Sequence, residues 1–218
     1  MTRLKMASLL PFGDSALLIK FGDDIDRLVN QRVHALDALL RASPKIGFIE
    51  SVPAYATLLV HYDPLILTYA QISDWVKTEM DRAGKNVSRK PRRIQVPVRY
   101  GGEDLDFVAA YHRISAREVV RIHASRDYIV YMMGFTPGFA YMGKLDDAIA
   151  TPRLGTPRTR VDAGSVGIAG AQTGIYPIAS PGGWRIIGRT SLRLFDLTAD
   201  APFLFSPGDL VRFVVSFQ

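Results

Sequence analysis

The sequence predicts an α+β protein with two domains, an α/β sandwich over residues 1–92 and a mostly β domain over residues 93–218. Two observations support this division. In the first part, segments with apolar residues at helical spacing alternate with short apolar extended segments. In the second part, residues 134–190 hold eleven of the chain's eighteen glycines, together with five prolines. This composition excludes long helices and indicates short strands joined by shaped loops.

The first domain is expected to follow a β-α-β-β-α-β order, which is typical of a ferredoxin-like sandwich of two helices on an antiparallel sheet. Its second helix opens with a capping box from Thr68 to Gln71. The last strand of the order lies at the start of the second domain. The expected elements are a strand at 15–21, a helix at 26–41, extended segments at 48–52 and 55–62, a helix from the capping box to near Gly84, and a strand at 93–100.

The second domain is expected to begin with two short helices and to continue as strands and turns that close, or nearly close, a barrel. Its second helix starts with a capping box from Ser115 to Glu118. The expected elements are helices at 105–112 and 116–124 and strands at 127–133, 165–169, 184–187, 192–197 and 210–217.

The overall composition is that of a folded globular protein, with 218 residues of which 48% are hydrophobic and 22% are charged. The chain contains no cysteine, which excludes thiol catalysis, disulfides and cysteine-ligated metal centres. The apolar segment near the N-terminus is too short and too interrupted for a signal peptide or a membrane span. We therefore expect a cytoplasmic protein with no membrane partner.

The net charge of +6 raises the question of a nucleic-acid partner. The one dense basic cluster is Ser-Arg-Lys-Pro-Arg-Arg at residues 88–93, between a predicted helix and a predicted strand. Basic segments are weak motifs, and nucleic-acid binders usually combine them with aromatic residues on one face. We interpret the cluster as a solvated linker and expect no nucleic-acid partner.

Two catalytic templates match the sequence only in part. Gly138 to Lys144 has the spacing of a phosphate-binding P-loop, but Leu145 stands where a magnesium-binding hydroxyl is required, and Pro152 soon ends any helix. The segment around Ser165 resembles a nucleophile elbow without its first glycine or its following helix. We expect no P-loop, and we expect Ser165 to be an ordinary residue of a strand or turn.

The four histidines, His34, His61, His112 and His123, all lie outside the glycine-rich stretch. No two of them have the spacing of metal ligands on one element. We interpret each as a surface or hydrogen-bonded structural histidine, and we expect no metal site in this chain.

Longer motifs carry a more specific signal than single glycines. Together they resemble the family of bacterial 5-oxoprolinase B subunits, also called allophanate hydrolase subunit 1 or kinase-inhibitor-like proteins, and the resemblance covers nearly the whole chain. The matching motifs are GDSAL at 13–17, YDP at 62–64, VPVxYGG at 96–102 with position 99 unmatched, GFTPGFAY at 134–141, the Pro-Arg pairs at 152–153 and 157–158, AGSV at 163–166, IAG at 168–170, QTGIYP at 172–177, SPGGW at 180–184 and IGRT at 187–190.

The resemblance implies an N-terminal ferredoxin-like domain followed by a C-terminal cyclophilin-like β-barrel. It also implies two partner proteins, the C and A subunits of 5-oxoprolinase. The assembly would cleave 5-oxo-L-proline to L-glutamate while ATP, used with Mg²⁺, is hydrolysed to ADP and phosphate. We expect no tightly bound cofactor in this chain, and we expect the isolated chain to be inactive.

Candidate site residues come from the matched motifs. Arg153, Arg158 and Arg189 are expected to bind carboxylate or phosphate, because a guanidinium offers a planar fork of donors to such groups. Gln172 is the candidate for the lactam N–H and carbonyl, and Tyr176 and Trp184 are candidates for the pocket wall. Asp162 is a candidate base or water-orienting carboxylate. The alternative is that the aromatic residues pack the barrel and the arginines contact a partner protein.

Two other functions remain open from the sequence. One branch of the family that this sequence resembles inhibits a sensor histidine kinase by protein–protein binding. This function requires a binding surface and no catalytic residues. Related domains also occur in urea and allophanate breakdown, fused to biotin-dependent modules. This chain has no biotin-attachment motif, so it would be only a component of such a system.

Overall fold

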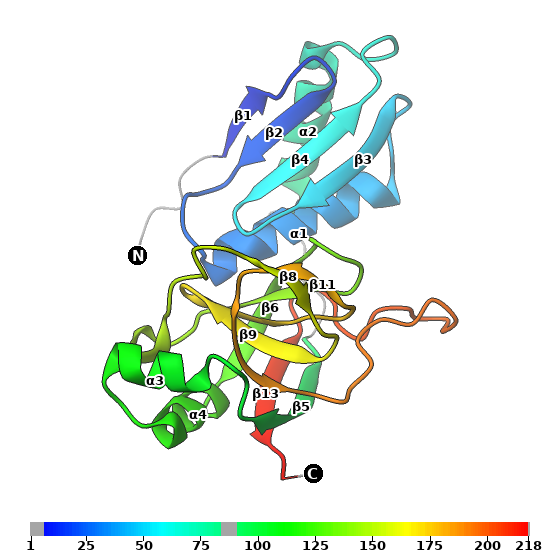
Figure 1. Cartoon of the computed structure of the whole chain (residues 1–218). Helices are drawn as coiled ribbons and strands as arrows, with labels where there is room; N and C mark the ends of the chain where they lie inside the picture. The colour runs from blue at the N-terminus through cyan, green and yellow to red at the C-terminus, as the bar shows by residue number, and fades with distance from the viewer. Residues whose placement is uncertain (1–6, 84–90, 218) are drawn as a thin grey trace. The chain divides into compact units, whose positions relative to one another are not determined.

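The computed structural model describes residues 7–83 and 91–217, and the chain divides into two compact units, residues 1–90 and 91–218 (Figure 1). The elements of the first unit are β1 (Ser8–Pro11), β2 (Ala16–Lys20), α1 (Arg27–Ala42), β3 (Phe48–Pro53), β4 (Thr57–Tyr62) and α2 (Tyr69–Ala83).

The first unit is an antiparallel sheet with the strand order β1-β2-β4-β3 and two helices packed on one face (Figure 1). Alternation along the strands buries Leu17 and Ile19 of β2 on this face, where they meet Leu36 of α1 and Val76 of α2. Residues one position along, such as Leu18, face the other side of the sheet because side chains alternate with a period of two.

Both helices of this unit begin where their capping residues indicate. The Asp26 carboxylate accepts hydrogen bonds from the backbone N–H groups of Leu28 and Val29, at 2.8 and 2.9 Å. At the start of α2, the Thr68 N–H donates to the Gln71 side chain at 2.8 Å, and the Gln71 N–H donates back to the Thr68 hydroxyl at 3.3 Å. The predicted capping box is confirmed, since both reciprocal bonds are present.

The predicted β-α-β-β-α-β order is wrong, because residues 93–100 do not join this sheet. The edge beside β2 is occupied by β1, which precedes β2 in the chain. Residues 93–100 instead form β5, whose Val96 and Val98 are buried in the core of the second unit. The expected ferredoxin-like domain is therefore not confirmed. Short, largely exposed β1 carries little apolar alternation, which is why its sequence gives no strand signal.

The second unit is built around a closed barrel with the strand order β10-β7-β6-β13-β5-β12-β9, flanked by a two-stranded ribbon of β8 and β11. Its elements are β5 (Arg93–Tyr100), α3 (Leu105–His112), α4 (Ala116–Ala124), β6 (Asp127–Met133), β7 (Ala140–Gly143), η1 (Asp147–Ile149), β8 (Arg158–Val161), β9 (Ser165–Ala169), β10 (Gln172–Ile175), β11 (Ser180–Gly182), β12 (Arg185–Arg189) and β13 (Leu210–Val215).

The barrel prediction is confirmed, and so are both short helices, with the Ser115 hydroxyl accepting from the Glu118 N–H at 3.1 Å. The predicted strand at 192–197 is wrong: this segment is irregular and pairs only through a bridge between Phe195 and Phe203. Asp196 folds it into a turn by accepting from the N–H of Thr198 at 3.0 Å.

His123 lies at the centre of a buried polar network in the second unit. One ring nitrogen is 2.7 Å from the Tyr100 hydroxyl, and the other is 2.8 Å from the Thr173 hydroxyl. Burial lowers the pKa of His123 to about 3, so the ring is neutral at physiological pH. The interpretation of His123 as a hydrogen-bonded structural residue is confirmed.

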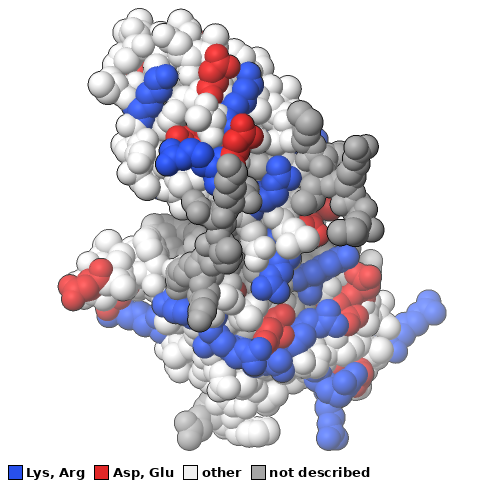
Figure 2. Space-filling model, turned by 180° about the vertical axis from the view of Figure 1, so that it is seen from behind, with Lys and Arg blue, Asp and Glu red and all other residues white. Residues whose placement is uncertain are grey.

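Basic side chains gather in a band across the second unit when the molecule is viewed from behind (Figure 2). Arg92 forms an ion pair with buried Asp209, and Arg93 pairs with Asp127 at 2.6 Å. The predicted solvated linker is therefore wrong for these two arginines, which belong to the barrel unit; residues 88–90 of the predicted cluster lie outside the described residues.

Across residues 7–83 and 91–217, no helix has the length and apolar character needed to cross a membrane.

Candidate functional site

Two cavities of the second unit adjoin each other along the chain: Pro157 and Trp184, which precede β8 and β12, line the first, and residues of β8 and β12 line the second. We call the first, of about 290 Å³, the aromatic cavity, and the second, of about 470 Å³, the arginine cavity. The aromatic cavity is lined by Phe135, Phe139, Tyr141, Arg153, Tyr176 and Trp184 among others. The arginine cavity is lined by Arg99, Glu103, Arg160, Asp162, Ser165 and Arg189 among others. Both volumes are of the size that small-molecule sites have.

The wall of the aromatic cavity is a set of edge-to-face ring contacts around Phe139, which is fully buried. The Phe139 ring lies 4.8 Å from Tyr141, 5.4 Å from Tyr176 and 5.4 Å from Trp184, measured between centroids. Edge-to-face pairs at such distances are favourable beyond their area of burial. The wall is consequently rigid, and its shape is set by the packing of a small hydrophobic cluster beside the main core of the barrel.

Two glycines make room for these rings. A Cβ at Gly182 would lie 2.3 Å from the Tyr176 hydroxyl oxygen, and one at Gly174 would lie 3.1 Å from both the Phe139 and the Trp184 rings. Tyr176 is itself buried and has no space to retreat. The frequency of glycine in residues 134–190 therefore has a concrete cause here, because backbone must approach large aromatic side chains closely.

A single cation faces this apolar wall. The Arg153 guanidinium lies 5.9 Å from the centre of the Trp184 ring, within the range of a cation–π contact, and the side chain is exposed. Burial raises the pKa of the Tyr141 and Tyr176 hydroxyls, so both are neutral hydrogen-bond donors at physiological pH. The cavity thus offers flat apolar surface, neutral donors and one positive charge.

Arg158 lies between the two cavities and is already occupied by protein carboxylates. Its guanidinium is 2.8 Å from buried Asp104 and 3.0 Å from Glu103, and it also donates to the Trp184 carbonyl at 3.2 Å. Asp104 accepts in addition from the Ile186 N–H at 2.7 Å. These bonds hold β8 against the start of β12, which gives Arg158 a structural role in supporting both cavities.

The arginine cavity lies on the outer surface of the barrel, where Arg99 of β5 and Arg189 of β12 are directly opposite each other in the antiparallel pair. Arg160 donates to Asp162 at 3.1 Å, and the Arg189 guanidinium is 3.9 Å from the other oxygen of the same carboxylate. The Asp162 side chain is 52% exposed. Its carboxylate therefore serves two arginines and is open to solvent.

The structure separates the candidate residues proposed from sequence into distinct places. Arg153, Tyr176 and Trp184 line the aromatic cavity, whereas Asp162 and Arg189 line the arginine cavity. Gln172 begins β10 and contributes to neither cavity. Sequence reasoning missed Arg99 and Tyr141: Tyr141 lies inside the motif GFTPGFAY, whereas Arg99 occupies the unmatched position of the motif at 96–102. Their importance depends on cross-strand neighbours, which the linear sequence does not give.

The segments of the two partial catalytic templates form strands of the barrel. Residues 140–143 form β7 rather than a phosphate-binding loop, and a buried Leu145 follows. Ser165 is the first residue of β9 and is buried. Within the described part of the chain, no three His, Asp or Glu side chains come together in a way that could hold a metal ion.

Comparison with known proteins places these features in a family. Residues 7–205 match the sequence profile described as carboxyltransferase domain, subdomain C and D. The chain is 42% identical to the B subunit of 5-oxoprolinase from Bacillus subtilis, covering 93% of this chain and 90% of the relative. It is 41% identical to the B subunit of 5-oxoprolinase from Haemophilus influenzae, covering 95% of this chain and 97% of the relative.

Longer proteins also contain this fold. The crystal structure of TTHA0988 superposes with a TM-score of 0.83 at 37% identity, over 93% of this chain and 40% of that one. The urea amidolyase of Kluyveromyces lactis has the same fold, with a TM-score of 0.77 at 21% identity over 96% of this chain and 15% of that chain. A urea amidolyase of Saccharomyces cerevisiae is 25% identical over 92% of this chain and 13% of its own length.

Proposed function

The chain belongs to the carboxyltransferase subdomain C and D family, alongside 5-oxoprolinase B subunits, and we propose that it is the B subunit of an ATP-dependent 5-oxoprolinase. The enzyme would cleave 5-oxo-L-proline to L-glutamate while ATP is hydrolysed to ADP and phosphate. The aromatic cavity would hold the 5-oxoproline, and the exposed Arg153 that faces its aromatic wall is the observation that carries the proposal.

The aromatic cavity suits 5-oxoproline because this substrate is a small, flat lactam ring that carries one carboxylate. Trp184 and Tyr176 would contact the ring, and Arg153 would bind the carboxylate, since a guanidinium offers two parallel donors to such a group. Tyr141 also lines the cavity, and its neutral hydroxyl would donate to the lactam carbonyl oxygen. Gln172 and Arg158 are not part of this proposed site, because Gln172 lies elsewhere and Arg158 is held by Asp104.

The need for ATP follows from the chemistry of the lactam. An amide carbonyl is a weak electrophile, so transfer of the terminal phosphoryl group of ATP to the carbonyl oxygen would release ADP and activate the ring carbon. Water then attacks that carbon, the carbon–nitrogen bond breaks, and a second water releases phosphate to leave glutamate. Such a reaction needs cations around the phosphoryl group. The Mg²⁺ that accompanies ATP would be held by the nucleotide or by a partner, since the described residues of this chain offer no metal site.

Partner proteins are part of the proposal. The relatives are named as subunits, and in longer proteins such as TTHA0988 this fold accounts for less than half of the chain. Arg153 and Phe135 are exposed at the rim of the aromatic cavity, where a second protein surface would exclude water from the substrate. We propose the C and A subunits of 5-oxoprolinase as these partners, and we expect the chain to be inactive alone because its reacting groups are then not all positioned.

The test is phosphate release from ATP, measured with and without 5-oxoproline, for the chain alone and for the assembly that co-purifies with it. Release that depends on 5-oxoproline only in the assembly is the expected result. An intact assembly whose ATP hydrolysis ignores 5-oxoproline would contradict the proposal. Inhibition of a sensor histidine kinase by such an assembly would then favour the alternative function of a protein inhibitor.

A component of urea or allophanate breakdown is the second candidate, favoured by the similarity to urea amidolyases over nearly the whole chain. The same assembly can be offered allophanate in place of 5-oxoproline, and release of ammonia measured. Ammonia release from allophanate without any effect of 5-oxoproline would replace the proposed function by this one.

A further inference from the structure

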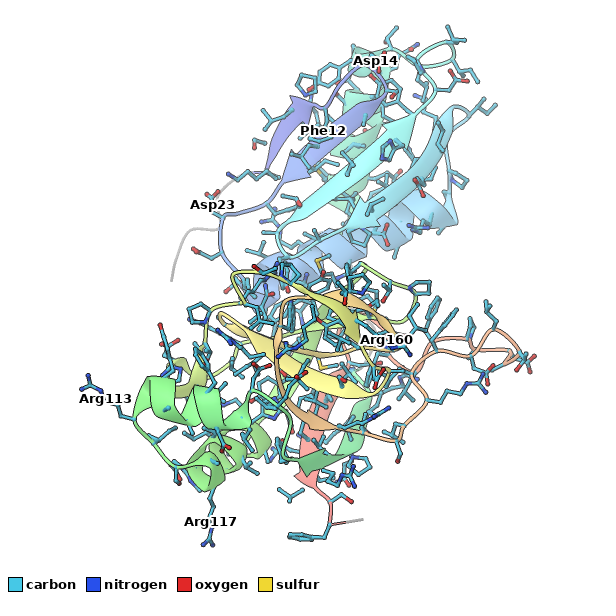
Figure 3. All side chains as sticks on the ribbon, in the orientation of Figure 1. Phe12, Asp14, Asp23, Arg113, Arg117 and Arg160 are labelled. Carbon is cyan, nitrogen blue, oxygen red and sulfur yellow. The ribbon has the colours of Figure 1, made fainter. Side chains whose placement is uncertain are left out.

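Arg99 and Arg189 face each other across β5 and β12 at a position where like charges are unfavourable. They are direct partners in the antiparallel register, so their side chains project from the same face of the sheet with Cβ atoms about 5 Å apart. Arg160 lines the same cavity from β8, and its position on the barrel surface is labelled in Figure 3. Three arginines therefore line one concave surface.

The carboxylates of the cavity do not neutralise these charges. Asp162 is shared between Arg160 and Arg189, and Glu103 is engaged by Arg158. The Arg99 side chain forms no hydrogen bond or ion pair with any residue in the described ranges 7–83 and 91–217. Among the described residues of this unit, Arg113, Arg117 and Arg153 also form no ion pair. The other arginines outside the cavity are ion-paired, namely Arg92, Arg93, Arg121, Arg126, Arg158, Arg185, Arg193 and Arg212.

An excess of guanidinium groups around a concavity is a binding site for an anion. The planar fork of each arginine matches phosphate oxygens, and an anion would relieve the repulsion between Arg99 and Arg189. The cavity lies next to the aromatic cavity, because Pro157 and Trp184 line one while Arg160 and Ile186 line the other. An anion held here would thus be adjacent to the proposed substrate.

We propose that the arginine cavity binds a phosphate group, with Arg99, Arg160 and Arg189 as its donors. The chemistry is shared by two sources, the terminal phosphate of ATP and the inorganic phosphate that its hydrolysis releases. Assigning the phosphate to ATP rests on the proposed function, whereas binding of phosphate by this cavity does not. Asp162 has the role of orienting two of these arginines rather than of a catalytic base.

The experiment is isothermal titration of the purified chain with inorganic phosphate and, separately, with ATP, at ionic strength held constant with chloride. The variants are Arg99→Ala, Arg99→Lys and the control Arg117→Ala. Arg117 lies on α4 and points into solvent, away from the cavity (Figure 3). We expect the dissociation constant for phosphate to rise about tenfold or more in Arg99→Ala, which is the effect of losing one charge-assisted hydrogen bond.

For Arg99→Lys we expect a dissociation constant for phosphate between those of the wild type and Arg99→Ala. Lysine keeps the positive charge but lacks the planar set of donors of the guanidinium group. Equal phosphate affinity in Arg99→Ala and Arg117→Ala would overturn the proposal, as would absence of phosphate and ATP binding to the wild-type chain. The proposal would also be overturned if the wild-type chain did not bind phosphate and Arg99→Ala no longer formed the complex. That pair of results would indicate that the arginines bind an acidic surface of a partner protein. Tighter binding of ATP than of phosphate would identify the nucleotide as the source.

The phosphate site and the proposed 5-oxoprolinase function can fail independently of each other. Phosphate binding that depends on Arg99 in an assembly with no response to 5-oxoproline would sustain the phosphate site and remove the 5-oxoprolinase assignment. The reverse pattern, 5-oxoproline-dependent ATP hydrolysis with unchanged turnover and phosphate affinity in Arg99→Ala, would sustain the function and remove the site.

Discussion

The two neighbouring cavities of the second unit differ in what lines them: buried aromatic rings line one, and exposed arginines line the other. The aromatic cavity is an extension of a hydrophobic cluster that contains Phe139, Tyr176 and Trp184, so folding itself sets its shape. The arginine cavity is made of exposed charges, and the pair Arg99 and Arg189 opposes folding because like charges are held together. The first contributes to stability, while the second is retained at some cost to it.

This difference separates residues that stabilise the fold from residues that bind a ligand. The aromatic wall belongs to a buried hydrophobic cluster and would form whether or not a ligand binds, whereas the exposed Arg153 that faces it is not part of that cluster. The arginines of the arginine cavity repel one another and are not fully neutralised by the fold, so together they favour binding of an anion. The comparison predicts that substitutions divide sharply into those that change stability and those that change binding.

The largest expected effect is that of Phe139→Ala, which removes the ring at the centre of the aromatic wall. We expect the free energy of unfolding to fall by about 3–5 kcal/mol, because a fully buried phenylalanine leaves a cavity that the surrounding rings cannot fill. Urea unfolding followed by Trp184 fluorescence, in a Trp75→Phe background, measures the second unit. Phe12→Ala is the control, since Phe12 is exposed in the first unit (Figure 3). A loss below about 1 kcal/mol in Phe139→Ala would show that the wall is not part of the core.

The next effect concerns the junction between the cavities. Asp104→Ala removes the buried carboxylate that holds Arg158, Arg185 and the Ile186 N–H, and we expect a loss of about 3 kcal/mol. Glu103→Ala is a matched control, because Glu103 binds the same Arg158 from an exposed position and should cost less than about 1 kcal/mol. The same unfolding assay compares them, and equal losses in the two variants would contradict the structural role of the buried pair.

A smaller effect is expected from pH, through the buried network around His123. The pKa of His123 is about 3 in the folded chain and near 6.5 when unfolded, so the unfolded state binds more protons between these values. Its contribution to stability is present above pH 6.5 and is lost as the pH falls toward 3. We expect a loss of about 2 kcal/mol between pH 7 and pH 5. Urea unfolding at the two pH values gives this difference, and an unchanged free energy would mean that His123 is accessible to protons in the folded state.

The smallest effect on stability is expected in the arginine cavity. Arg99→Ala should change the free energy of unfolding by less than about 0.5 kcal/mol, in the stabilising direction at low salt, because it removes a like-charge repulsion at an exposed position. Thermal unfolding in phosphate-free buffer, at low and high chloride, is the measurement, with Arg117→Ala beside it. A clear destabilisation would show that Arg99 supports the fold, and the contrast between the two cavities would fail.

Much of the fold follows from local patterns in the sequence. Asp26, Thr68 and Ser115 each begin a helix where capping chemistry places it, and the glycine-rich region does form short barrel strands. The errors arise where pairing is non-local. Residues 93–100 have an equally good strand pattern for either unit, and only the parallel pairing with β13 and the pairing with β12 place them in the barrel. Short strands rich in glycine, such as β10, have too little alternation to be recognised.

The candidate site was predictable in residue type but not in arrangement. The motifs identify Arg153, Tyr176 and Trp184, which do share a cavity. They do not distinguish an arginine held by a buried carboxylate, as Arg158 is, from one that faces a cavity, as Arg189 does. This distinction depends on Asp104, which lies far away in sequence and becomes a partner only through the packing of α3 on β12.

The most direct test of the account is steady-state ATP hydrolysis by the assembled complex as a function of 5-oxoproline concentration, with wild-type chain, Arg153→Ala and Arg117→Ala. If Arg153 binds the substrate carboxylate in the aromatic cavity, KM for 5-oxoproline rises about tenfold or more in Arg153→Ala and is unchanged in Arg117→Ala. The same KM in all three complexes would contradict the account, because the one cation of the aromatic cavity would then have no part in binding the substrate.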